Sequence, residues 1–239
     1  MKSTLQDMPH SRIQKLTGTP GKTPPARRND GSIKGKKRDA AATRARLLQA
    51  AMEEFAAKGL DARIEDIAEA AGANRRMAYY YFGSKEGLYL ASLEAAFFEL
   101  VQVEQAIDVD AMDPLAAIEA LVLAKFEHYV KYPHYVEFLK IENVYQGRYL
   151  KLSKRTAEMR APLISIIQRV LERGQAKGIF RKDVDPLDLY LSICALGFFV
   201  FSNRHTLGAI FKTDVISASA LKRRRKHIIE MVTAYLRVR

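Results

Sequence analysis

Side chains that could contact nucleic acid gather in one short stretch of the sequence: Arg75, Arg76, Tyr79, Tyr80, Tyr81 and Lys85. A guanidinium group pairs bidentately with guanine or binds a phosphate oxygen, and a tyrosine hydroxyl donates a hydrogen bond to phosphate. Consecutive residues of a helix point about 100° apart, so the three tyrosines cannot all face a core. These residue types therefore indicate contact with both the bases and the backbone of double-stranded DNA.

Two short helices joined by a tight turn would position these side chains. Apolar residues between positions 64 and 71 recur at helical spacing, and a second short helix is predicted from Asn74 to Phe82. In the turn, Gly72 can adopt the positive φ of a helix C-cap, and Asn74 can cap the next helix. The first turn of that helix presents Arg75, Arg76 and Met77, which is where a DNA-binding helix-turn-helix contacts base edges.

Basic residues on either side of this pair extend the predicted contact surface. A helix is predicted from Thr43 to Lys58, and it carries Arg44 as a further candidate. Ser84 is suited to cap a long helix that runs to about Gln105. Lys85, at the start of that helix, would bind phosphate together with the amides and the partial positive charge of the helix N-terminus.

The run IEDIAEAAGANRRMAYYYFGSKEGLY, residues 64–89, resembles the N-terminal signature of the TetR family of bacterial regulators. The resemblance, which covers residues 43–93, implies a homodimer that binds a palindromic DNA operator and is released by a small-molecule effector bound between the helices of its larger domain. The sequence departs from the family at Arg63, where Ser or Thr often caps the helix, although Arg63 could reach a phosphate instead. The alternative function is an activator or an architectural factor without a small ligand.

The chain is predicted to be all-α, with an N-terminal three-helix DNA-binding helix-turn-helix domain and a larger helical ligand-binding and dimerisation domain. Asp113-Pro114 and Asp185-Pro186 each have the pattern of a cap followed by proline, so helices are predicted from there to about Tyr132 and Asn203. Further helices are predicted over residues 135–145, 160–177 and 217–237. The predicted parts are a disordered basic tail over 1–40, the DNA-binding domain over 41–88 and the effector-binding and dimerisation domain over 89–239.

Positive charge is concentrated near the N-terminus. The net charge is +12, and residues 1–46 hold twelve Lys or Arg and only three Asp. Residues 1–40 also contain four Pro and four Gly without an apolar period, so they cannot bury enough surface to offset the entropy of ordering. This tail is either a DNA-contacting arm or a passive linker. A second basic run, residues 222–226, is more typical of a solvated helix face than of a second binding site.

Two apolar sets in the predicted larger domain are candidates for its other functions. Four aromatic residues could form the walls of an effector pocket, although ordinary core packing explains them more simply: Phe126, Tyr129, Phe138 and Tyr145. The resemblance implies a four-helix bundle made by the last two long helices of each subunit, and there the candidate interface residues are Leu189, Ile193, Leu196, Phe199 and Val200. Packing within one subunit explains that stripe equally well.

No set of residues in the sequence suggests catalysis or a cofactor, since a Ser/His/Asp set, a phosphate-binding glycine loop and paired carboxylates are all missing. The single cysteine, Cys194, cannot form an internal disulfide, and the histidines are too scattered for a metal site. The N-terminus lacks a secretory signal, and the longest apolar run, residues 189–201, is shorter than the about 20 residues that span a bilayer. We therefore expect a cytoplasmic protein that is not an enzyme and has no membrane partner.

Overall fold

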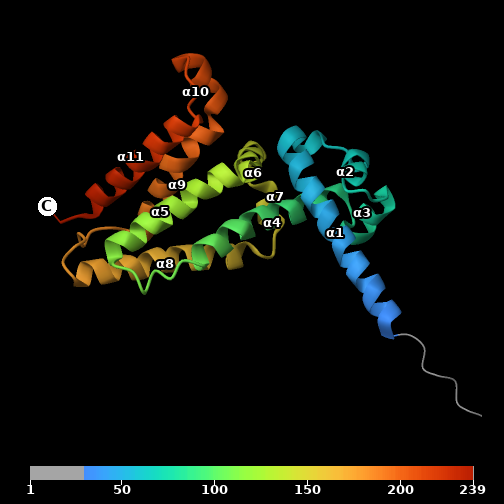
Figure 1. The fold of residues 1–239 in the computed structure, drawn as a ribbon, viewed down its shortest axis with the longest axis horizontal. Coiled ribbons are helices and arrows are strands. Elements are labelled where there is room, and N and C mark those ends of the chain that lie inside the picture. Colours follow the sequence, from blue (N-terminus) through green and yellow to red (C-terminus); the bar gives the residue numbers. More distant parts are fainter. Residues whose placement is uncertain (1–29, 239) are drawn as a thin grey trace, which may run out of the picture. The chain divides into compact units, whose positions relative to one another are not determined.

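The computed structural model describes residues 30–238, without the side chains of residues 30–38 and of several residues between 156 and 163. Residues 39–238 lie in one compact unit. The described residues form eleven α-helices and a short 3-10 helix, in the order α1 (Asp30–Lys58), η1 (Gly59–Asp61), α2 (Ile64–Ala70), α3 (Arg75–Phe82), α4 (Lys85–Gln105), α5 (Pro114–Lys131), α6 (Pro133–Val144), α7 (Arg148–Leu152), α8 (Thr156–Ala176), α9 (Pro186–Ser202), α10 (Arg204–Phe211) and α11 (Ala218–Leu236) (Figure 1).

The predicted helices are present, with three differences. Residues 30–40 belong to α1, where the sequence suggested a disordered tail. The alanine-rich segment after Lys37 lacks Gly and Pro, so it has a high helix propensity and continues the helix backwards. The remainder of the suggested tail, residues 1–29, lies outside the described residues. Helices α7 and α10 were not predicted, because each is short and follows directly on the end of another helix.

The first three helices pack against the start of α4 to form a small unit, called the head below. Gly59 and Gly72 adopt φ of +61° and +59° where α1 and α2 end, which is the left-handed conformation expected of a helix C-cap. The Asn74 side chain accepts a hydrogen bond from the backbone N–H of Arg76 and so caps α3, while Ser84 caps α4 in the same way through Gly87. The core of the head is apolar and fully buried, with Leu47, Ala51, Phe55, Ile67 and Leu88 at its centre.

The larger part of the unit is built around α5, which packs against α4, α8, α9 and α11 (Figure 1). The two helices predicted from an Asp-Pro pair, α5 and α9, begin as predicted, since Asp113 accepts a hydrogen bond from Leu115 N and Asp185 accepts one from Asp188 N. Within the described part of the chain, no single helix is long and apolar enough to cross a membrane; α9 and α10 pass that test only as a pair bent by 67°.

Tyr89 connects the head to the larger part. Its buried ring packs edge-on against Phe55 of α1 at 5.2 Å and against Tyr149 of α7 at 4.6 Å between ring centroids. Its hydroxyl donates to Glu142 of α6 at 3.2 Å, and the second oxygen of that buried carboxylate accepts from Leu150 N at 3.0 Å. Burial, with the nearby carboxylate, raises the pKa of Tyr89, so the hydroxyl stays protonated. One side chain therefore contacts elements of both parts.

Candidate nucleic-acid interface

The first turn of α3 presents both arginines to solvent. Arg75 donates to Glu65 of α2 at 2.7 Å, and this hydrogen bond lowers the pKa of the Glu65 carboxyl. Arg76 is exposed, and within the described part of the chain its side chain makes no ion pair. Arg76 is thus free to contact a ligand directly, whereas Arg75 has to leave Glu65 or to bridge Glu65 and the ligand.

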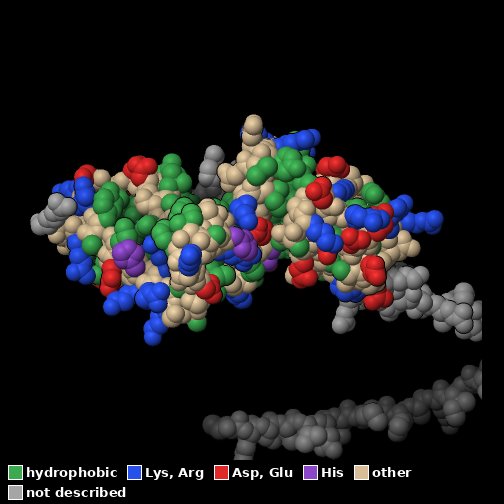
Figure 2. Space-filling model, turned by 90° about the horizontal axis from the view of Figure 1, so that it is seen from above, with side chains coloured by type: hydrophobic (Ala, Val, Ile, Leu, Met, Phe, Trp, Pro, Cys, Tyr) green, Lys and Arg blue, Asp and Glu red, His purple; other side chains and the backbone are tan. Residues whose placement is uncertain are grey.

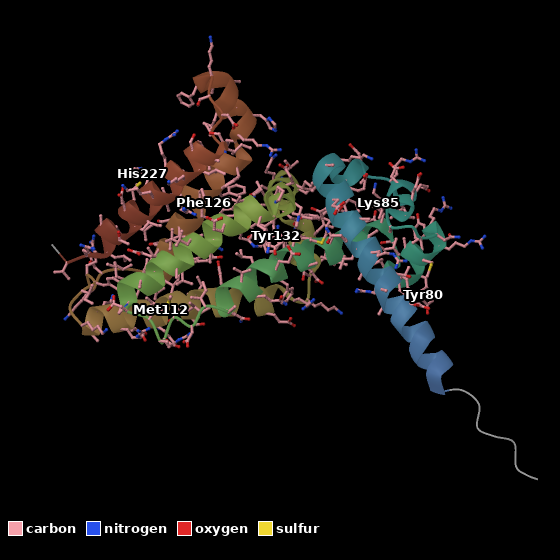
Figure 3. The ribbon with its side chains drawn as sticks, viewed as in Figure 1. Tyr80, Lys85, Met112, Phe126, Tyr132 and His227 are labelled. Carbon is pink, nitrogen blue, oxygen red and sulfur yellow. The ribbon has the colours of Figure 1, made fainter. Side chains whose placement is uncertain are left out.

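The three tyrosines of α3 have different environments. Tyr80 is 82% exposed and projects from the head, and Tyr79 is 43% exposed (Figure 3). Tyr81 is half-buried, and its ring packs edge-on against those of Tyr80 at 5.2 Å and Phe82 at 6.4 Å. Met77 is also half-buried. Two tyrosine hydroxyls are consequently available at the surface, while Tyr81 and Met77 serve partly in packing.

Lys85 and Arg44 are held by contacts within the head. The Lys85 ammonium donates to the backbone carbonyl of Leu60 in η1, so it joins the start of α4 to the end of α1. An ammonium has three donors, which leaves two for a phosphate. The Arg44 guanidinium lies over the ring of Phe82, 4.9 Å from its centroid, at the end of α3. Both side chains remain at the edge of the surface formed by α3.

Two further arginines surround α2. Arg63 occupies the N-cap position with an extended backbone and makes no capping hydrogen bond, and its side chain is 70% exposed, 4.0 Å from Glu65. Arg46, which the sequence analysis did not select, donates to the carbonyl of Ala71 at 3.1 Å and to Thr43 at 3.2 Å. Arg46 therefore fixes α1 to the end of α2. No motif indicates this role, because the contact spans 25 positions of the sequence.

Charge is mixed on the face of the molecule that Figure 2 shows. Lys and Arg side chains are interspersed there with Asp and Glu, and they are not gathered into one continuous positive patch.

The aromatic residues considered for an effector pocket do not all come together. Phe126 and Tyr129 are buried and both contact Phe201 of α9, at 5.5 and 5.7 Å between ring centroids. Phe138 is buried against Tyr89 instead. Tyr145 is 42% exposed beyond the end of α6. Phe126 and Tyr129 thus share one site, while the other two lie on the side of α6 and α7 that faces the head.

A group of polar side chains lies beside Tyr129, and we call it the polar cluster: the buried Glu104, Lys125 and His128 and the half-buried Tyr190 and Cys194. The Lys125 ammonium is 2.7 Å from the Glu104 carboxylate and donates to the Tyr190 hydroxyl at 2.7 Å. The sequence carried a signal for it, since Lys125 and His128 lie three residues apart on the buried stripe of α5. Polar residues on such a stripe are costly unless they are paired.

The candidate dimer stripe on α9 faces inward for the most part. Leu189 and Ile193 are each 3% exposed, Leu196 and Val200 are half-buried, and Phe199 is 53% exposed. The stripe that faces solvent instead contains Leu187, Leu191, Ala195 and Phe199, at a spacing of four residues. Of this stripe, Ala195 lines an open groove of about 400 Å³, which Leu189 and Leu196 of α9 and Met231 and Tyr235 of α11 also line. Phe199 is the residue that the predicted dimer stripe and the solvent-facing stripe share.

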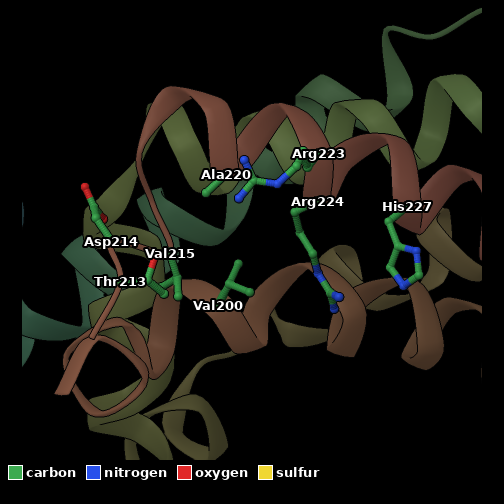
Figure 4. A pocket seen from close by; sticks show the side chains of 8 residues that line it. All are labelled: Val200, Thr213, Asp214, Val215, Ala220, Arg223, Arg224 and His227. Carbon is green, nitrogen blue, oxygen red and sulfur yellow. The ribbon is translucent and has the colours of Figure 1, made fainter. Parts of the chain in front are cut away.

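A second open groove, of about 300 Å³, lies where the basic run of α11 approaches the end of α9 (Figure 4). Arg224 lines this groove and donates to the carbonyl of Leu196 at 2.8 Å. Its neighbour Arg225 pairs with Glu127 of α5 at 2.7 Å. Part of the basic run therefore packs α11 against its neighbours, and Arg223 and His227 complete the solvated side of the groove.

Two family models match the chain. Residues 47–92 match the model described as "Bacterial regulatory proteins, tetR family", and residues 114–232 match the model described as "Tetracyclin repressor-like, C-terminal domain". The first range contains α2, α3 and most of the head, and the second contains α5 to α10 and most of α11.

Several relatives and solved structures are similar over most of their length. The HTH-type transcriptional repressor NicS of Pseudomonas putida is 37% identical over 179 residues, which are 74% of this chain and 84% of that protein. The HTH-type transcriptional regulator RutR of Escherichia coli K12 is 31% identical over 69% of this chain and 78% of its own length. A tetR-family regulatory protein from Rhodococcus has the same fold, with a TM-score of 0.64 at 19% identity over 83% of this chain and 98% of that one. The ketosteroid transcriptional regulator KstR2 of Mycobacterium tuberculosis gives 0.59 at 22% identity over 82% and 95%.

Proposed function

The chain belongs to the tetR family of bacterial regulatory proteins, and we propose that it represses transcription as a homodimer that binds a palindromic operator and is released by a small-molecule effector. The observation that carries the proposal is the capped N-terminus of α3, which presents Arg75 and Arg76 to solvent. The names of its relatives as repressors favour repression over activation. Such a protein acts in the cytoplasm, where the operator DNA lies.

In the proposed complex, α3 enters the major groove by its N-terminal end. Arg76 contacts base edges, and Arg75 does so after releasing Glu65. The exposed hydroxyls of Tyr79 and Tyr80, with Lys85, Arg44 and Arg63, bind phosphates and fix the register of the helix. In a dimer, two such helices about 34 Å apart meet successive major grooves on one face of the DNA, which is why the operator is an inverted repeat.

Alanine at Arg75 or Arg76 is expected to weaken binding to the operator by about 5- to 150-fold and to relax its sequence preference, because each loses a base contact. The operator is first selected from random DNA with the native protein, and affinities are then measured by fluorescence anisotropy. Lys226→Ala, on the exposed side of α11, is the matched control and leaves affinity for the operator unchanged. Unaltered specificity in the double variant Arg75→Ala/Arg76→Ala would remove the arginines from base recognition.

The proposed dimer face is the solvent-facing stripe of α9 together with Met231 and Tyr235. Its apolar groove continues across two helices, as an interface between two helix pairs requires. Leu191→Asp is expected to yield a monomer at micromolar concentration in sedimentation velocity, because a carboxylate cannot be buried there without a partner. The control is Val144→Asp, at a residue of α6 that is 76% exposed, and it stays dimeric. A Leu191→Asp dimer of unchanged stability would place the interface elsewhere.

A further inference from the structure

The polar cluster joins three helices inside the apolar core of the larger part. Glu104 comes from α4, Lys125 from α5 and Tyr190 from α9. The Glu104 and Lys125 side chains are 5% and 2% exposed, and the Lys125 ammonium also lies 4.5 Å from the centroid of the Tyr190 ring. Replacing a buried ion pair by apolar residues is often neutral or stabilising, so this pair is weak support for the fold itself.

The His128 imidazole is buried with its hydrogen-bonding capacity unused. It is 2% exposed, and among the described residues neither Nδ1 nor Nε2 has a hydrogen-bond partner. Burial, with the charge of Lys125, lowers the pKa of His128 to about 3, so the imidazole is neutral at pH 7. A neutral imidazole offers one N–H donor and one N acceptor. Leaving both unpaired in the core costs free energy that a bound molecule would recover.

The two charges within the polar cluster already cancel. Lys125 and Glu104 form a neutral pair, and the imidazole carries no charge. A bound acid would draw Lys125 away and leave Glu104 unpaired, and a bound amine would do the reverse. Each outcome leaves an uncompensated charge in the core, which is strongly unfavourable. An uncharged molecule leaves the ion pair intact.

The surroundings of His128 also restrict the shape and the size of a ligand. Its ring packs against Tyr132 at 4.7 Å and Tyr135 at 4.9 Å between centroids, so aromatic faces flank the free nitrogens. A cavity beside Glu104, Lys125 and Tyr190 has about 10 Å³, the room of one water molecule. A ligand must therefore open its own space between the aromatic rings, which favours a small, flat molecule.

We infer that the effector is a small, planar, uncharged molecule that both donates and accepts hydrogen bonds, and that it binds at His128 beside the Lys125–Glu104 pair. This inference rests on the proposed ligand-released function. The effector separates α5 from α9 as it enters, since the cluster is closed without it. Tyr190 lies on the α9 side of the site, where its hydroxyl accepts from Lys125.

Three probes that share one ring and differ in charge test the class of ligand: benzamide, benzoate and benzylamine. Each is titrated at pH 7.4 into the full-length protein carrying ¹⁵N-labelled histidine. Molecules of this size bind with Kd on the order of millimolar. We expect benzamide to shift the His128 ring resonances and to raise Tm by a few degrees, and the two charged probes to do neither.

Two variants make the result specific. His128→Phe identifies the resonance and abolishes the benzamide response while the protein stays folded, since the native imidazole has no hydrogen bond to lose. His205→Gln, at an exposed residue of α10, keeps the full response. A larger His128 shift with benzoate or benzylamine overturns the inference, as does an absent shift with benzamide.

Binding of the selected operator is measured separately and without any probe. A protein that binds benzamide at His128 but no operator refutes the proposed function and leaves the site in place. A protein that binds its operator and is released by benzoate but not by benzamide refutes the inferred ligand class alone. The two failures are therefore distinguishable.

Discussion

Lys125→Met is expected to lower the free energy of unfolding by about 3–5 kcal/mol. The substitution leaves the Glu104 carboxylate buried without a counter-charge, and it removes the donor to the Tyr190 hydroxyl. Urea unfolding followed by far-UV circular dichroism measures the loss, because the chain contains no tryptophan for fluorescence. Lys226→Met, which removes a lysine whose side chain is 78% exposed, is the matched control and changes the free energy of unfolding by less than about 0.5 kcal/mol.

The double variant Glu104→Leu/Lys125→Met separates the ion pair from simple packing. Removing both charges eliminates the unpaired carboxylate, so most of the lost stability is expected to return. A double variant as unstable as Lys125→Met would mean that the volume and shape of the lysine stem, and not its charge, hold the three helices together.

Gly87→Ala is expected to disrupt the joint between α3 and α4 and to reduce operator binding by more than tenfold. A Cβ at this position would lie 2.1 Å from the carbonyl oxygen of Phe82, which belongs to the backbone and cannot rotate away. The start of α4 has to move away from the end of α3, and this also misplaces the Ser84 cap, whose side chain accepts from Gly87 N. Overpacking of this kind costs roughly 1–3 kcal/mol of stability.

Gly208→Ala is the appropriate control for that substitution, because a Cβ there has its nearest neighbour, the carbonyl oxygen of Thr213, at an ordinary 3.5 Å. Circular dichroism and anisotropy with the selected operator compare the two variants. Native affinity in Gly87→Ala would show that the α3–α4 joint adapts without moving the DNA-contacting side chains.

Local signals in the sequence predicted most of the helices. Helix α4 begins at the predicted residue because Ser84 caps its first turn, and it ends at Gln105, as predicted. Asn74, Asp113 and Asp185 also cap the helices expected of them. Each of these signals acts within a few residues of the helix end, so one sequence is enough to detect it.

The orientation of α9 could not be predicted in the same way. This helix is apolar on nearly every side, so its periodicity does not distinguish the face toward α5 from the face toward solvent. Leu189 and Ile193 therefore appeared as interface residues, whereas Leu191 is the one exposed. The contact of Lys85 with the Leu60 carbonyl was unforeseen for a related reason, since it depends on how two distant segments pack.

Because Tyr89 contacts both the head and the larger part, operator binding and effector binding affect each other. The Tyr89 ring and hydroxyl touch α1, α6 and α7 together, so any tilt of the head that suits DNA also sets the packing of α6. By thermodynamic linkage, the factor by which an effector weakens operator binding equals the factor by which the operator weakens effector binding. Couplings of this kind are typically about 5- to 150-fold. Promoter-bound copies of the protein would accordingly respond only at higher effector concentrations than free copies do.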